Sequence, residues 1–105
     1  MNSEQPQKPV ADILIVDDTP INLRLFFFLL TRAGNEVRKA LNGETALRAA
    51  QSSLPDLILL DIMMPDMDGY QVCQQLKSDA KTRQVPVIFI SALNTDWYKE
   101  KAYDV

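Results

Sequence analysis

Four oxygen-bearing side chains stand directly after short apolar runs in this sequence. Asp17 and Asp18 follow the first run, Asp61 follows a later one, and Ser91 follows the last. If these runs are parallel strands of one sheet, their carboxyl ends meet at one edge, where open α/β sheets bind ligands. Polar residues that serve only solubility could lie in any loop, so their position after three separate apolar runs needs another explanation. We therefore interpret the four residues as parts of one site.

The chemistry of such a site follows from its charges. Three carboxylates held within a few Å repel one another unless a cation compensates them. Because every available donor is an oxygen and few protein ligands converge, Mg²⁺ with retained waters fits better than zinc or a full calcium cage. Mg²⁺ could bridge an Asp61 oxygen and an incoming phosphoryl group while the aspartate acts as a nucleophile. Ser91 could donate a hydrogen bond to that phosphoryl group.

The elements that must position these residues alternate along the chain. Apolar, β-branched runs predict buried strands, and apolar residues at helical spacing predict helices between them. Pro20 suits a first helical turn, Gly34 a left-handed helix end, and Pro55 ends the second helix. The expected strands are 13–16, 36–40, 57–60 and 85–90, and the expected helices are 20–33, 43–53, 69–77 and 94–103.

This alternation predicts an α/β fold with a doubly wound parallel sheet and right-handed crossovers. The strand order expected for this class is 2-1-3-4, continuing to a fifth strand. With 105 residues, the chain has room for one small domain. We expect a flexible tail at 1–11 and the domain itself at 12–105.

Composition excludes several function classes. The net charge of −3 disfavours direct nucleic-acid binding. The complete absence of histidine rules out Ser-His and Cys-His nucleophile pairs. A single cysteine, Cys73, cannot form an internal disulfide, which fits a cytoplasmic protein. The N-terminus has no signal-peptide pattern, and the apolar run from Leu25 to Leu30 is far too short to cross a membrane.

Three segments carry a family resemblance: ILIVDDTPIN, LPDLILLDIMMPDMDGYQV and VPVIFISA. Together they resemble the receiver domain of bacterial response regulators and hybrid histidine kinases, a flavodoxin-like fold, over roughly residues 12–105. The resemblance implies a two-component phosphorelay module that takes a phosphoryl group from a histidine kinase or phosphotransfer protein. It also implies limited self-catalysed phosphotransfer and dephosphorylation rather than an enzyme's turnover.

By the same resemblance, each site residue has an expected role. Asp61 is the phosphoacceptor, Asp18 a direct Mg²⁺ ligand, and Asp17 a ligand through water. The backbone carbonyl of Met63 is a further ligand, and Ser91 is the switch hydroxyl. Receivers also carry a lysine at the end of a fifth strand, followed by a fifth helix, and this sequence ends before them. Lys99 and Lys101 fall within the expected fourth helix and are not assigned that role.

Two other functions compete with this interpretation. An Mg²⁺-dependent phosphatase-like enzyme could pass through the same aspartyl phosphate, but the loop after Asp61 offers neither a general acid nor a cap. A nucleotide- or flavin-binding domain would need a glycine-rich phosphate loop, which the sequence lacks. Asp68 is better explained as a helix cap than as part of a calcium loop.

A sheet without a fifth strand would leave strand 85–90 at its edge. Apolar, low-charge edges favour pairing with another chain. We therefore expect self-association, through the fourth strand or the fourth helix.

Overall fold

Three of the four described strands form where the sequence is apolar, and the remaining strand, β2 (Glu36–Ala40), has the mixed sequence EVRKA. The computed structural model describes residues 10–90. Its strands are β1 (Asp12–Val16), β2 (Glu36–Ala40), β3 (Leu57–Asp61) and β4 (Val87–Ile90). All pairs are parallel, in the order β2-β1-β3-β4. The expected doubly wound sheet and its strand order are therefore confirmed.

The helices begin and end close to the positions that the sequence indicates. They are α1 (Pro20–Arg32), α2 (Gly43–Ser52) and α3 (Gly69–Ser78). Gly34 takes the expected left-handed conformation after α1, with φ of 99°. Asp68 caps α3 in a reciprocal arrangement with Gln71, as predicted for a helix cap. Of the described helices, none is long and apolar enough to cross a membrane.

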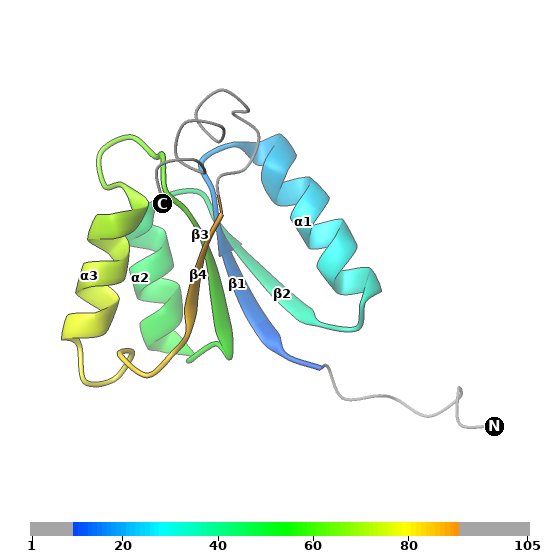
Figure 1. Ribbon diagram of the computed structural model, residues 1–105. Coiled ribbons are helices and arrows are strands. Elements are labelled where there is room, and N and C mark those ends of the chain that lie inside the picture. Colours follow the sequence, from blue (N-terminus) through cyan, green and yellow to red (C-terminus); the bar gives the residue numbers. More distant parts are fainter. Residues whose placement is uncertain (1–9, 91–105) are drawn as a thin grey trace, which may run out of the picture.

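Helices cover both faces of the sheet, with α1 on one side and α2 and α3 on the other (Figure 1). Side chains alternate along each strand, so each strand contributes to two cores. Leu14 and Val16 of β1 pack with Ile58 and Leu60 of β3 toward α2 and α3. Ile13 and Ile15 pack toward Leu23 of α1. Burial on both faces fixes the strands' register.

β4 begins later than the sequence suggests. We expected a strand over 85–90, but it starts at Val87. The amide of Val85 donates to Thr82 in a turn, at 3.1 Å. Pro86 has no N–H to give and contributes only its carbonyl, which accepts from the Ile58 amide at 3.0 Å. The helix expected at 94–103 lies outside the described residues.

Candidate functional site

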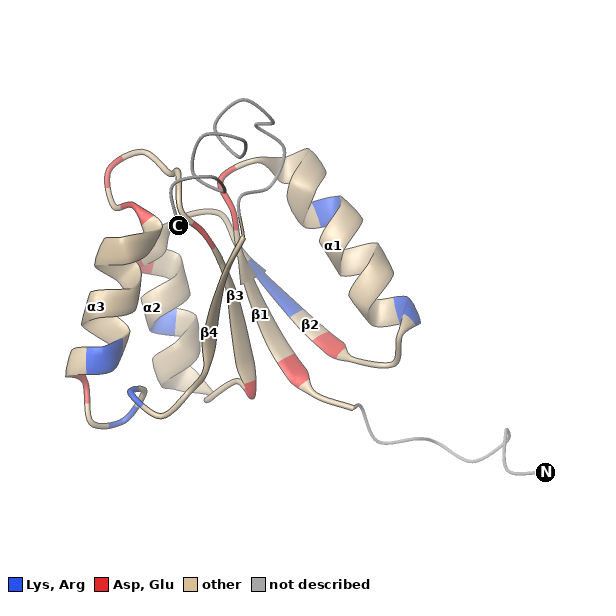
Figure 2. Cartoon of the chain, viewed as in Figure 1, with Lys and Arg blue, Asp and Glu red and all other residues tan. Residues whose placement is uncertain are grey.

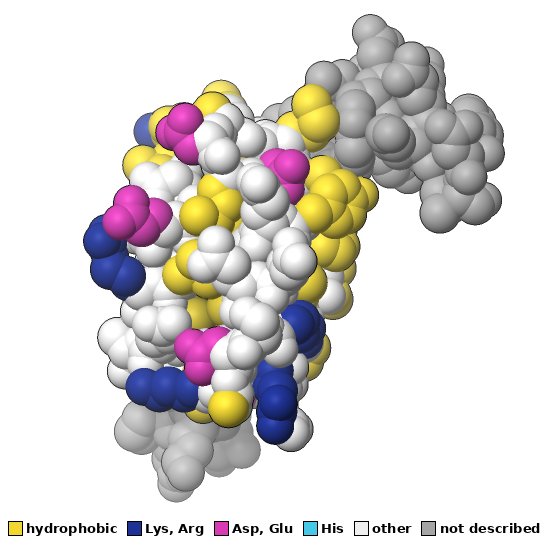
Figure 3. All heavy atoms as spheres, turned by 90° about the vertical axis from the view of Figure 1, so that its left-hand side faces the viewer, with side chains coloured by type: hydrophobic (Ala, Val, Ile, Leu, Met, Phe, Trp, Pro, Cys, Tyr) yellow, Lys and Arg dark blue, Asp and Glu magenta, His cyan; other side chains and the backbone are white. Residues whose placement is uncertain are grey.

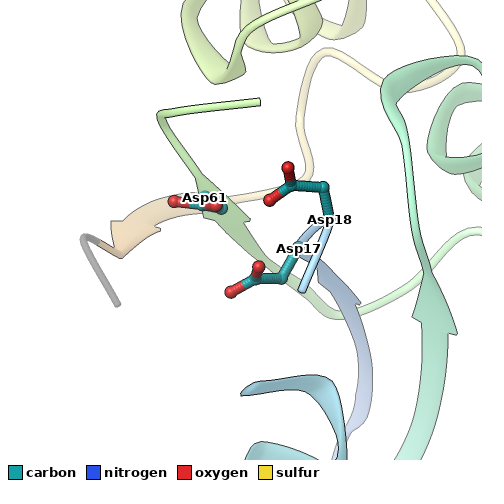
Figure 4. Close-up of side chains that lie close together, drawn as sticks. All are labelled: Asp17, Asp18 and Asp61. Atoms are coloured by element: carbon teal, nitrogen blue, oxygen red, sulfur yellow. The ribbon is translucent and has the colours of Figure 1, made fainter. Parts of the chain in front are cut away.

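Three aspartates meet at the carboxyl edge of the sheet. Asp17 and Asp18 follow β1 directly, and Asp61 is the last residue of the neighbouring strand β3. One carboxylate oxygen from each lies within 4.8 Å of the others. Figure 4 shows the three side chains close together, and Figure 2 shows acidic positions at the ends of both strands. The parallel pairing of β1 with β3 brings together residues 43 or more positions apart in sequence.

The first turn of α1 holds the Asp17 carboxylate in place. Its Oδ1 accepts a hydrogen bond from the backbone N–H of Thr19 at 2.9 Å. Its Oδ2 accepts one from the side-chain amide of Asn22 at 3.3 Å. Asp17 is completely buried, and each of its two carboxylate oxygens accepts a hydrogen bond from a protein group. Asp18 is only half-buried, and its Oδ1 accepts a long hydrogen bond of 3.4 Å from the Thr19 hydroxyl.

Close packing behind β3 fixes the position of Asp61. The chain leaves β3, forms a loop and returns so that the Gly69 amide donates to the Ile62 carbonyl at 2.9 Å. A Cβ atom at residue 69 would collide with the Asp61 carbonyl oxygen and lie 2.9 Å from the Ile62 Cα. Only glycine allows α3 to begin this close to the strand end. This contact fixes the position of the Asp61 backbone, from which the carboxylate extends.

Burial first, and then the nearby negative charges of Asp17 and Asp18, raise the pKa of Asp61 to about 7. The Met63 backbone amide opposes them by donating to Asp61 Oδ1 at 3.4 Å. Within residues 10–90, neither of the two ion pairs involves these aspartates. The cluster thus concentrates negative charge that the described side chains do not neutralise.

The donor set fits a hard divalent cation. Carboxylate oxygens from three residues converge, and Mg²⁺ prefers oxygen ligands, while soft donors are absent from the cluster. Asp17, Asp18 and Asp61 are the residues that would hold the cation.

Comparisons with known proteins agree with this geometry. Residues 13–105 match the model of the response regulator receiver domain. The chain belongs to this family. Over 84 residues it is 52% identical to the response regulator PleD of Caulobacter vibrioides, covering 80% of this chain and 18% of that protein. The chain thus spans under a fifth of that relative.

Solved structures that resemble this chain are also receiver domains. The N-terminal domain of a response regulator receiver protein from Methanoculleus marisnigri is 38% identical, with a TM-score of 0.77, covering 89% of this chain and 77% of that one. A sensor histidine kinase receiver domain from Pseudomonas aeruginosa is 31% identical, with a TM-score of 0.73, covering 84% and 74% of the two chains. That structure contains a magnesium ion coordinated in its active-site cleft.

Family membership establishes the general class of function. The protein contains a receiver domain of two-component signalling, which is a signalling module rather than a classical enzyme. Receiver domains bind Mg²⁺ at an acidic pocket and interact with histidine kinases and phosphotransfer proteins. The comparisons do not favour the phosphatase-like alternative.

The structure of this receiver adds residues that sequence reasoning missed. Asn22 and Gly69 were not identified as parts of the site, although both contact it. Asn22 stands five residues after Asp17, in the first turn of the helix that follows the acidic pair, and this spacing is the signal that could have revealed it. Gly69 follows the Asp68 cap, where the approach of α3 to β3 is not visible from sequence. Ser91 lies outside the described residues.

Proposed function

We propose that Asp61 accepts a phosphoryl group from the phosphohistidine of a histidine kinase or phosphotransfer protein, with Mg²⁺ held by the aspartate cluster. The observation that supports this proposal is the convergence of Asp61 with Asp17 and Asp18 at one edge of the sheet. Asp61 is buried and its backbone packs against Gly69, so both its side chain and its backbone have a fixed position. The rest of the cluster supplies the charge that attracts a cation.

The transfer balances as a simple displacement. A carboxylate oxygen of Asp61 attacks the phosphorus, the P–N bond to the donor histidine breaks, and that nitrogen keeps the electron pair. An acyl phosphate on Asp61 is the product. Bound Mg²⁺ would supply charge neutralisation for the phosphoryl oxygens. Asp61 must be ionised to attack, and a cation beside it lowers its pKa from the raised value near 7.

Intact-mass measurement tests this assignment. The protein is incubated with Mg²⁺ and a small phosphodonor such as acetyl phosphate or phosphoramidate, and we expect a mass increase of one phosphoryl group. Asp61→Asn should show none. Asp66→Asn is a matched control in the same loop, because Asp66 has φ of 69° and asparagine tolerates that left-handed conformation. An adduct that persists in Asp61→Asn would refute the assignment.

We further propose that Asp18 binds Mg²⁺ directly and Asp17 acts through water. The hydrogen bonds support this division, because both Asp17 oxygens already accept from Thr19 and Asn22, whereas Asp18 is half-exposed and less engaged. Calorimetric titration should show that Asp18→Ala weakens Mg²⁺ binding more than Asp17→Ala. Equal losses would contradict the proposed roles.

The remaining assignments stay predictions. They are the Met63 carbonyl as a ligand, Ser91 as the switch hydroxyl, and the start of the domain at residue 12. The position of Met63 is compatible with its role, since its amide already contacts Asp61.

Self-association through β4 is also a proposal. In the described part of the sheet, β4 is the edge strand, and Ile88 and Phe89 are 52% and 37% exposed. Phe89 also packs against the exposed Tyr70 ring in a tilted arrangement, with centroids 5.1 Å apart. On the side that carries α3, hydrophobic side chains gather along one margin (Figure 3). Light scattering across a dilution series should show a dimer that dissociates on dilution, and a monomer at every concentration would contradict it.

A further inference from the structure

The N-terminus of α1 differs from those of the other two described helices. At α2, the side chain of the N-cap residue Asn42 accepts from the Thr45 amide at 2.8 Å. At α3, the side chain of Asp68 accepts from the Gln71 amide at 2.9 Å. Thr19 is the N-cap residue of α1, and threonine favours this position, yet its side chain makes no capping hydrogen bond. The Thr19 hydroxyl is therefore not used to cap the helix.

Thr19 instead contacts both aspartates that follow β1. Its hydroxyl donates to Asp18 Oδ1 at 3.4 Å. A carboxylate oxygen accepts hydrogen bonds, so the hydroxyl hydrogen points to Asp18 in this contact. The backbone N–H of Thr19 donates to Asp17 Oδ1 at 2.9 Å. Each of the two donors of this residue therefore holds a different member of the aspartate cluster.

The hydroxyl contact matters most for Asp18, because this carboxylate has fewer restraints than Asp17. Asp17 is completely buried and also accepts from the Asn22 side-chain amide. Asp18 is half-buried, and among residues 10–90 its carboxylate accepts from the Thr19 hydroxyl alone. The terminal torsion of an aspartate side chain is broad, so a carboxylate without a partner can turn. A donor on Oδ1 restricts that torsion and leaves Oδ2 available to a cation.

We infer that Thr19 is a positioning residue for the cation site: its hydroxyl orients the Asp18 carboxylate, which points toward Asp61 (Figure 4). This inference rests on the proposed function, in which Asp18 binds Mg²⁺ directly. Mg²⁺ requires near-ideal octahedral geometry, so a ligand that is free to turn binds it less well. Losing a hydrogen-bond partner of a ligand weakens metal binding by roughly 10- to 100-fold. Because the Thr19 contact is long, we expect a loss of about tenfold.

Calorimetric Mg²⁺ titration of Thr19 variants tests the inference. Thr19→Val replaces the hydroxyl with a methyl group, and valine suits the extended backbone of residue 19, with φ of −104° and ψ of 111°. It should bind Mg²⁺ about tenfold more weakly than the wild type. In the presence of a chelator it should melt at nearly the wild-type temperature, because no capping bond is lost. Thr19→Ser keeps the hydroxyl and should restore wild-type Mg²⁺ affinity.

Asn42→Ala is the matched control, because it removes a cap that does form. This variant should melt at lower temperature and bind Mg²⁺ normally, the opposite of Thr19→Val. Wild-type Mg²⁺ affinity in Thr19→Val would overturn the inference, and so would equal weakening in Thr19→Ser. In either case the proposed function stands. If the wild type binds no Mg²⁺, the proposed function fails and the inference fails with it.

The rate of phosphoryl uptake gives a second readout. Thr19→Ala also lacks the hydroxyl and serves if Thr19→Val does not fold. Adduct formation from acetyl phosphate is followed by intact mass over a range of Mg²⁺ concentrations. Because the Thr19 hydroxyl contacts Asp18 rather than Asp61, the variant should need about ten times more Mg²⁺ for half of its maximal rate, with that maximal rate nearly unchanged. A lower maximal rate with an unchanged Mg²⁺ requirement would overturn the inference.

Discussion

Replacing Asp61 with asparagine should stabilise the ion-free protein at neutral pH. Asparagine has the shape of aspartate but no charge, and Asp61 is 6% exposed beside two other carboxylates. Its pKa rises from 3.8 to about 7, first because of burial and then because of Asp17. Ionising Asp61 in the folded protein is therefore more costly than ionising it in the unfolded chain.

The sign and the pH window follow from that shift. A carboxyl group with a raised folded-state pKa contributes stability that is fully present below its unfolded pKa and is lost as the pH rises through the folded value. For Asp61 the loss runs from about pH 4 to about pH 7. A shift of roughly three pH units corresponds to about 4 kcal/mol. Because solvent and salt reach this edge of the sheet, we expect about 2 to 4 kcal/mol in the measured free energy of unfolding.

Urea denaturation of both proteins, with a chelator present, measures this quantity between pH 5 and pH 8. Subtracting the wild-type free energy of unfolding from that of Asp61→Asn removes the contribution of titrating groups that lie far from the cluster. The difference should already amount to about a third of its full value at pH 5, grow with pH and level off above about pH 7.5. A melting temperature higher by roughly 10 °C should accompany it at pH 7.5. A difference that does not change with pH would refute the reasoning.

Three further predictions follow from the same contacts. Millimolar Mg²⁺ should raise the melting temperature of the wild type at pH 7.5 and raise that of Asp61→Asn much less, since binding to the native state alone stabilises it. Gly69→Ala should cost about 2 kcal/mol or more in urea denaturation, because the new Cβ collides with the backbone of Asp61, and an unchanged midpoint would count against the packing described. Asn42→Ala should cost about 1 kcal/mol by loss of the α2 cap, in which the Asn42 side chain accepts from the Thr45 amide at 2.8 Å, while leaving Mg²⁺ affinity unchanged in titration.

The sequence by itself determined the elements and their order. Apolar runs marked β1, β3 and β4, whereas β2, with the sequence EVRKA, carried only a weak pattern. Pro20 and Gly34 marked the two ends of α1. These signals are local, because hydrophobic periodicity and the backbone preferences of proline and glycine act within a few residues. The convergence of Asp17, Asp18 and Asp61 was also predictable, because parallel strands must end at a common edge.

The tertiary structure decided how that cluster is held and charged. The burial that raises the pKa of Asp61 depends on several elements of the fold. The contact between Gly69 and the Asp61 backbone joins α3 to β3, and the hydrogen bond from the Asn22 amide to Asp17 joins α1 to the end of β1. The start of β4 at Val87 likewise involves a hydrogen bond from the Ile58 amide of β3 to the Pro86 carbonyl. Such features depend on which groups approach across the fold, and side-chain desolvation and hydrogen bonding are set by those neighbours rather than by spacing along the chain.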